Sequence, residues 1–249
     1  MTEEKRLKRR HFPFLCQLKR VFDVEAIKRE INTLEKEYGW IDISYEADSY
    51  KKLSVSRENL FQAFEDEKGE FSKYHQIVLT EFDKSRAKES GKSEISETVS
   101  LGKFSRYKSS MSRAIGELDE ANYGKRRAFL RLAPTINQVL DSFKSPISRV
   151  RLAKIDPGFK IKPHIDNDTV YGVRYHLAIQ TNPKSILGFR KSPKDDFEIY
   201  HIPANGHLYF INAGFEHFAE NMGDEARIHL VIGVDGQADI QSELGLINT

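Results

Sequence analysis

The feature that most constrains the fold is a succession of short β-rich runs that fills the second half of the sequence. Turn-forming pairs such as Pro157-Gly158, Asn182-Pro183 and Asn205-Gly206 separate these runs. Short strands that recur about every 8–12 residues with turn signals between them predict a β-sandwich or barrel. The runs cover residues 148–155, 159–165, 173–180, 185–191, 197–202 and 207–212, and a hairpin of two paired strands is expected within residues 210–234.

The first half of the sequence has a mainly helical pattern. Asp23 can cap a helix whose apolar residues recur at helical spacing and which ends at Gly39. A further helix is expected from Pro134, and residues 70–82 also have a helical pattern, whereas residues 12–18 suit a strand. We expect these helices to cover one apolar face of the β unit.

Charge is concentrated between the helical patterns and at the N-terminus. Residues 61–125 are rich in charged residues, and residues 85–103 within them have the composition of a mobile loop. The basic residues between Lys5 and Arg10 fit a solvated terminus. We expect a flexible basic N-terminus (1–11), a mostly helical region (12–144) with the charged, partly mobile segment (about 61–125), a β domain (145–236) and a C-terminal tail (237–249).

Composition excludes several classes of protein. Of the 249 residues, 39% are apolar and 31% are charged, which is typical of a soluble globular protein. The net charge of +2 gives no argument for binding nucleic acid. Cys16 is the only cysteine, so no internal disulfide can form. No run is as apolar as a membrane span or a signal peptide, and we expect a cytoplasmic protein without a membrane partner.

Three residues of the β half have the chemistry of a metal site. His164 and Asp166 are two positions apart, so both side chains project to the same side of a strand. His217 follows about fifty residues later, in another β-rich run. Two imidazoles and one carboxylate form the facial triad of non-haem Fe(II) oxygenases, which leaves metal positions open for a cosubstrate and for O2. The same residue types also occur by chance in a surface turn or a protein core.

Arg227 adds a reason to prefer the metal site. It follows His217 by ten positions, and pairing of the two hairpin strands would place them on neighbouring strands. Oxygenases with this triad consume 2-oxoglutarate, a dicarboxylate whose keto-acid end can chelate the metal. The far carboxylate then needs a cation, and arginine supplies a permanently charged, bidentate one.

The run at 173–180, VRYHLAIQ, presents two different faces. Alternation places Arg174 and His176 on one face, and Tyr175 and Leu177 on the other, apolar face. The polar face either meets solvent or lines a polar pocket. If it lines a pocket, Arg174 and His176 lie near the metal site.

The motifs KPHIDND, VRYHLAIQTNP and GHLYFINAGFEHFAENMGDEARIHLVIGV resemble those of the aspartyl/asparaginyl β-hydroxylase family, Fe(II)/2-oxoglutarate-dependent dioxygenases that include bacterial free-proline hydroxylases. The resemblance covers about residues 148–235. It implies an α+β fold whose C-terminal half is a double-stranded β-helix of the jelly-roll or cupin type, covered by N-terminal helices. It also implies that His164, Asp166 and His217 bind iron, that Arg227 binds the far carboxylate of 2-oxoglutarate, and that His176 and Arg174 contact the cosubstrate. The vertebrate members have glycine where Asp166 stands, so their substrate is a poor guide.

The sequence therefore predicts a dioxygenase that uses Fe(II), 2-oxoglutarate and O2 to hydroxylate an unactivated C–H bond. The expected substrate is an amino acid, free or in a peptide. One alternative is a cupin-like module that binds a metal or a small anion without turnover. A more remote one is an oxygenase acting on another substrate class such as nucleic acid, which we do not expect as a partner. The carbon attacked, the stereochemistry and the oligomeric state stay open.

Overall fold

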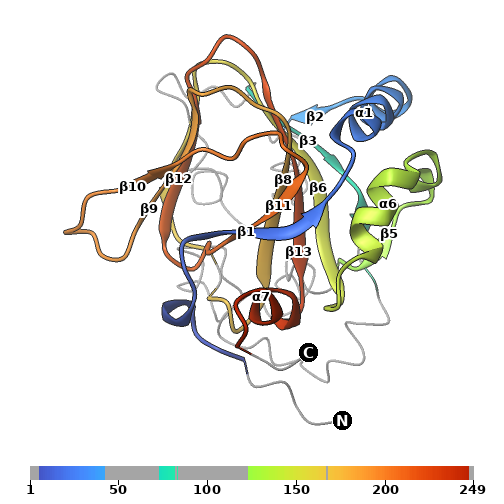
Figure 1. Cartoon of the computed structure of the whole chain (residues 1–249). Helices are drawn as coiled ribbons and strands as arrows, with labels where there is room; N and C mark the ends of the chain where they lie inside the picture. The colour runs from blue at the N-terminus through green and yellow to red at the C-terminus, as the bar shows by residue number, and fades with distance from the viewer. Residues whose placement is uncertain (1–5, 43–72, 82, 84–122, 167, 247–249) are drawn as a thin grey trace, which may run out of the picture.

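The computed structural model describes residues 6–42, 73–81, 83, 123–166 and 168–246. Strands dominate these ranges (Figure 1). The elements, in chain order, are η1 (Arg9–His11), β1 (Leu15–Val21), α1 (Val24–Tyr38), β2 (Ile41–Asp42), β3 (Tyr74–Val78), β4 (Thr80–Glu81), β5 (Lys125–Arg126), η4 (Ala128–Leu132), α6 (Pro134–Asp141), β6 (Ile147–Ile155), β7 (Phe159–His164), β8 (Val173–Gln180), β9 (Ser185–Arg190), β10 (Glu198–Tyr200), β11 (His207–Ile211), β12 (Glu216–Asn221), β13 (Arg227–Val234) and α7 (Ala238–Glu243).

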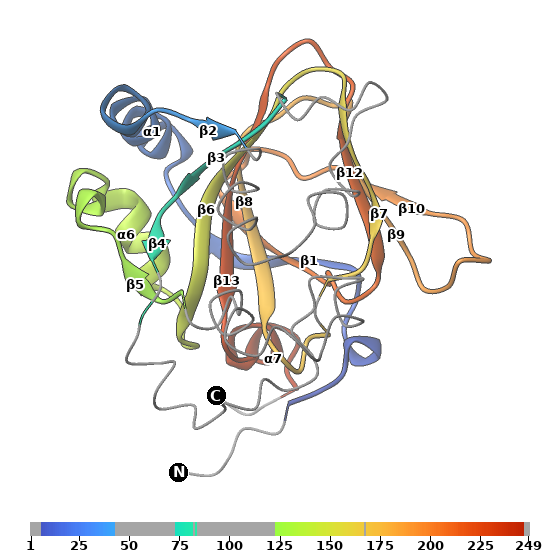
Figure 2. The same ribbon diagram turned by 180° about the vertical axis from the view of Figure 1, so that it is seen from behind.

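Two antiparallel sheets face each other. The larger has the order β1-β11-β8-β13-β6-β3-β2, and the smaller has the order β10-β9-β12-β7. Figures 1 and 2 show β7, β9, β10 and β12 on one side, opposite the larger sheet. Successive strands from β6 to β13 alternate between the sheets, except for β9 and β10, which pair within the smaller one, as in a jelly roll. This arrangement confirms the predicted double-stranded β-helix.

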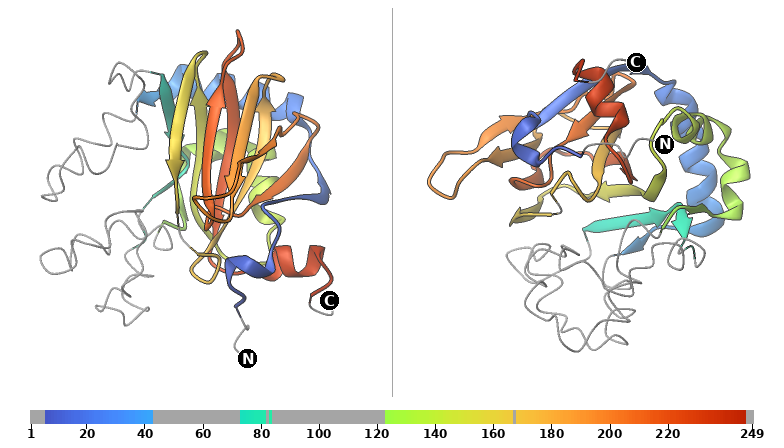
Figure 3. Two further views of the ribbon diagram at one scale, coloured as in Figure 1. Left: turned by 90° about the vertical axis from the view of Figure 1, so that its left-hand side faces the viewer. Right: turned by 90° about the horizontal axis from the view of Figure 1, so that it is seen from below.

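The larger sheet lies between two apolar cores because its strands alternate in side-chain direction. Its outer face contributes Tyr175, Leu177 and Ile232 to a core that it shares with the helices. Its inner face contributes Ala178 and Val231 to a second core that it shares with the smaller sheet. Figure 3 shows the resulting layers, with α1 and α6 outside the larger sheet. The predicted helical cover is confirmed.

The sequence signals for the two main helices are confirmed. The Asp23 carboxylate accepts a hydrogen bond from the Ala26 amide at the start of α1, and Gly39 ends the helix with a φ of 68°. Pro134 begins α6. The Glu30 carboxylate of α1 accepts hydrogen bonds from two backbone amides in the first turn of α6. None of the helices in the described ranges is long and apolar enough to cross a membrane.

The helical interpretation of residues 70–82 is wrong for the part that the structure describes, residues 73–81. Tyr74–Val78 forms β3, which pairs with β6 on one side and with the short edge strand β2 on the other. In so short a segment, the spacing of apolar residues hardly distinguishes a helix from a strand. Pairing with a neighbouring strand of the sheet then determines the structure that forms. The N-terminal region thus supplies β1, β2 and β3 to the larger sheet. Residues 84–122, which include the predicted mobile loop at 85–103, lie outside the described residues.

The hairpin predicted within residues 210–234 is also wrong in its pairing. Both edges of β12 are occupied, by β7 and by β9, whereas β13 pairs with β6 and β8 in the other sheet. The connection between β12 and β13 is therefore an arch from one sheet to the other. Asn221 fastens this arch, since its side-chain amide donates to the carbonyls of Ile155 and Glu225. A hairpin and an arch have the same local alternation, which is why the sequence pattern did not separate them.

Candidate metal and dicarboxylate site

The three predicted metal ligands converge at one end of the smaller sheet. His217 on β12 pairs directly with His164 on β7, and the centroids of the two rings are 4.4 Å apart. Asp166 follows β7, and its backbone amide donates to the Ala213 carbonyl in the loop before β12. One ligand atom from each of the three side chains lies within 4.8 Å of the other two. The three residues could therefore hold a single metal ion.

Backbone carbonyls orient both imidazoles. Nδ1 of His164 lies 2.8 Å from the Lys162 carbonyl, and Nδ1 of His217 lies 2.9 Å from the Phe215 carbonyl. A carbonyl can only accept, so each Nδ1 carries the proton and each Nε2 keeps its lone pair. The Nε2 atoms are 3.7 and 3.9 Å from the Asp166 carboxylate. This donor set fits a divalent transition metal, because metal-bound histidines usually donate their other ring nitrogen in this way.

Charge keeps the ligands in the protonation states that metal binding requires. Burial alone would raise the pKa of Asp166, but the Arg174 guanidinium and the two histidines lower it well below its usual value. Arg174 also donates a hydrogen bond to the Asp166 carboxylate. Burial and the neighbouring His164 lower the pKa of His217 to about 4. Near neutral pH the carboxylate is ionised and His217 is neutral.

Arg227 lies on the opposite sheet from His217, facing the interior. Only 4% of Arg227 is exposed, and its Nε and Nη2 are 3.2 and 2.9 Å from the two ring nitrogens of His229. Burial lowers the pKa of the guanidinium to about 10, so it stays protonated at neutral pH. Among the described residues, no carboxylate forms an ion pair with it. A buried cation without an anion is costly, so the arrangement fits an anionic ligand between the sheets.

The polar face of β8 points into the space between the sheets. Arg174 and His176 project inward, while Tyr175 and Leu177 project into the outer core. His176 lies opposite Val231, and its Nδ1 is 3.3 Å from Nδ1 of His229. Burial, with Arg227 and Arg174 nearby, lowers the pKa of His176 well below its usual value. Of the two placements left open by the sequence, the inward one is therefore observed.

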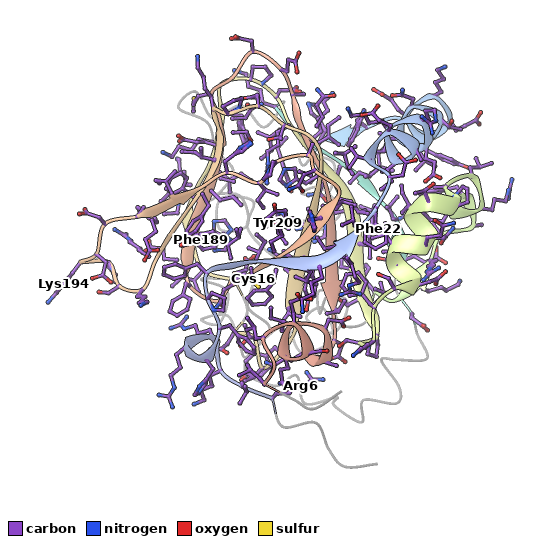
Figure 4. The ribbon with its side chains drawn as sticks, viewed as in Figure 1. Arg6, Cys16, Phe22, Phe189, Lys194 and Tyr209 are labelled. Atoms are coloured by element: carbon purple, nitrogen blue, oxygen red, sulfur yellow. The ribbon has the colours of Figure 1, made fainter. Side chains whose placement is uncertain are left out.

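Aromatic side chains enclose the histidines. The Phe189 ring stacks on His217 at 5.8 Å between centroids, and Phe14 stacks on Phe189 at 5.5 Å. Figure 4 labels Phe189 and Tyr209, which belong to the inner core from opposite sheets. Apolar walls of this kind exclude water and strengthen the electrostatic interactions inside.

Sequence reasoning missed two inward residues of this interior. Arg151 on β6 is 8% exposed and lies opposite the inward Val231. Tyr74 on β3 is 4% exposed, and its electrostatic interaction with Arg227 raises the pKa of the guanidinium. Alternation with the inward Ala153 could have placed Arg151, whereas Tyr74 was hidden in a segment interpreted as helix.

Comparison with solved structures gives distant likenesses. A capsular polysaccharide assembling protein from Staphylococcus aureus is 17% identical, with a TM-score of 0.29, over 37% of this chain and 26% of that chain. The chain thus matches only about a quarter of that protein's length. A Pseudomonas putida prolyl-4-hydroxylase is 12% identical over 90% of this chain and 93% of its own, with a TM-score of 0.44. A Trichoplax adhaerens prolyl hydroxylase, in complex with a hypoxia inducible factor peptide fragment, is 10% identical over 96% and 89%, with a TM-score of 0.43.

A family model also matches most of the chain. The model for aspartyl/asparaginyl β-hydroxylase aligns with residues 23–236, which include the smaller sheet, every strand of the larger sheet except β1, the helices α1 and α6, and all six predicted site residues. The chain therefore belongs to the aspartyl/asparaginyl β-hydroxylase family, whose members are Fe(II)- and 2-oxoglutarate-dependent hydroxylases.

Proposed function

We propose that this protein hydroxylates an unactivated C–H bond of an amino acid, free or within a peptide. The observation that carries the proposal is a pair of complementary features in one interior. Two oriented imidazoles and a carboxylate converge on one sheet, and a buried arginine without a carboxylate partner among the described residues faces them from the other. A metal-chelating dicarboxylate has the chemistry to satisfy both.

His164, Asp166 and His217 would hold Fe(II). The hydroxylation chemistry would come from the bound iron with 2-oxoglutarate and O2. The protein supplies orientation, because the carbonyls of Lys162 and Phe215 fix the direction of each Nε2. Asp166 supplies the negative charge, since Arg174 and the histidines keep it ionised.

Arg227 would bind the far carboxylate of 2-oxoglutarate. Its placement on β13 means that the dicarboxylate would span the space between the two sheets instead of lying along a hairpin. Arg174 and His176 project into the same space from β8, where they would contact the oxygens nearer the metal. The pKa of His176 stays low, so its ring would act as a neutral hydrogen-bonding group.

The substrate class follows from the family and from Asp166. The family's vertebrate members have glycine at this position, and its amino-acid hydroxylases keep the carboxylate. The chain keeps Asp166, which favours an amino acid as the substrate. Product analysis by mass spectrometry, over free amino acids and peptides, would identify it by a gain of one oxygen.

Anaerobic addition of Fe(II), ascorbate and 2-oxoglutarate tests the proposal. A weak visible metal-to-ligand charge-transfer band should appear in the native protein and be lost in His164→Ala. His11→Ala replaces an exposed histidine outside the triad and should keep the band. Absence of the band in the native protein would contradict the proposal.

The same assay separates the proposed enzyme from a cupin-like binding module. Both would bind a metal or an anion, but the enzyme alone should form succinate when O2 is admitted. Succinate formation that requires His217 and Arg227 supports the enzyme. A charge-transfer band without succinate, over a broad screen of amino acids and peptides, would favour the binding module.

A further inference from the structure

The N-terminal segment at residues 6–14 runs across the two turns that carry the proposed metal ligands. Arg6 donates to the Val170 carbonyl at 3.1 Å, and the Thr169 hydroxyl donates to the Leu7 carbonyl at 2.8 Å. Figure 4 shows Arg6 beside α7 at the base of the molecule. The described part of the basic N-terminus thus has specific partners, although its composition suggested a solvated, flexible terminus.

Arg9 connects this segment to both turns. Its backbone amide donates to the Asp168 carboxylate at 3.0 Å, and its Nε lies 3.8 Å from the same carboxylate. Its guanidinium donates to the Gly214 carbonyl and lies over the Phe215 ring, 5.2 Å from the centroid. Asp168 follows Asp166 by two residues, and Phe215 precedes His217 by two.

Further contacts fasten the segment on the His217 side. The buried Asn212 side chain donates to the carbonyls of Arg9, Phe12 and Pro13 at 2.9, 3.3 and 3.2 Å. The Asn212 amide donates to the Phe14 carbonyl at 2.8 Å. The loop before β12 is therefore bound to the N-terminal segment along its length.

We propose that Arg9 is a positioning residue that clamps the Asp166 turn against the His217 turn and so sets the spacing of the metal ligands. The clamp contacts residues next to the backbone carbonyls that orient the proposed metal ligands. Arg9 lies over the ring of Phe215, whose carbonyl orients His217. It also binds the Gly214 carbonyl, next to Ala213, whose carbonyl accepts from the Asp166 amide. Metal sites lose affinity when ligands shift by a fraction of an ångström, and loss of an outer partner costs about 10–100-fold. This inference rests on the proposed metal site.

The test compares Arg9→Gln with Arg10→Gln. Arg10 is an exposed neighbour whose side chain contacts His11 at 3.4 Å, and it serves as the matched control. Mn(II) replaces Fe(II) as an air-stable probe. The affinity of each variant for Mn(II) is measured below the temperature at which that variant unfolds. Arg9→Gln should weaken Mn(II) binding by about tenfold, and Arg10→Gln should leave it unchanged.

Hydrogen exchange of the metal-free protein supplies a second readout, which does not depend on the proposed function. Exchange in the peptides around Asp166 and His217 should rise about tenfold in Arg9→Gln and stay at the native rate in Arg10→Gln. Asp168→Asn, which weakens the clamp from its other end, should change both readouts in the same direction and serves if Arg9→Gln does not fold.

The outcomes separate the two ideas. If the native protein binds no Mn(II) or Fe(II), the proposed function fails, while the exchange experiment still tests the clamp. Unchanged exchange in Arg9→Gln overturns the clamp. If Arg9→Gln shows faster exchange but native Mn(II) affinity, the clamp exists but does not set the spacing of the metal ligands.

Discussion

The two faces of the larger sheet come from the same strands but differ in chemistry, because the inner face combines apolar residues with buried charged ones. On β8 and β13 the outer positions Tyr175, Leu177 and Ile232 lie in an apolar core under the helices. At the inner positions, Arg174 donates to the carboxylate of Asp166, a proposed metal ligand, and Arg227 is buried between the sheets. The outer face stabilises the sheet, and the rigidity it provides allows costly charged groups to be held on the inner face. Mutations on the two faces should therefore have separable effects.

The largest effect is expected at the proposed metal. His217→Ala should lower succinate formation by more than about 100-fold, because losing a ligand should exceed the about 10–100-fold cost of losing an outer partner. The far-ultraviolet circular dichroism spectrum should stay native, since the residue belongs to the inner site. If His217→Ala lost activity only because less of the protein was folded, the effects of the two faces on activity and on stability would not be separable.

Leu177→Ala probes the outer face. The residue is fully buried, so its truncation should lower the free energy of unfolding by about 2–5 kcal/mol. Urea denaturation measures this loss. In the fraction that stays folded, Mn(II) and 2-oxoglutarate affinities should be native, and a tenfold loss of either would show that the two faces are coupled.

Arg227→Lys tests the division of work between the sheets. Lysine keeps the charge but cannot form the bidentate contact, so the KM for 2-oxoglutarate should rise by about tenfold or more. The Mn(II) affinity, measured without 2-oxoglutarate, should stay near native because Arg227 lies on the sheet opposite the ligands. If both affinities fall together, Arg227 does not serve the cosubstrate alone.

The smallest effect is the pH dependence that His229 gives to stability. Burial, with Arg227 and His176 nearby, lowers its pKa well below the usual 6.5 in the folded protein. Below pH 6.5 the unfolded chain binds a proton that the folded chain refuses, so stability falls as the pH falls. The expected slope is about 1.4 kcal/mol per pH unit. Denaturation at pH 7, 6 and 5 should give a flatter dependence in His229→Gln than in His11→Gln.

The candidate site was more predictable from the sequence than its surroundings were. His164 and Asp166 share one short segment, and alternation alone places both side chains on one side of it. Alternation placed Arg174 and His176 on one face of a strand, but whether that face met solvent or a pocket was decided only by the packing of the two sheets. Tyr74 could not be placed, because its direction depends on the pairing of β3 with β6, which lies far away in the chain.

The sequence by itself determined the β-rich architecture, the helical cover, and which residue types could bind a metal and a dicarboxylate. Alternation, capping and turn residues are local properties, so the chain records them directly. Only the tertiary structure decided that β3 is a strand, that β12 and β13 belong to different sheets, and that Arg9 joins two distant turns. Each of these depends on hydrogen-bond partners far away in the chain, and those partners exist only after the sheets assemble.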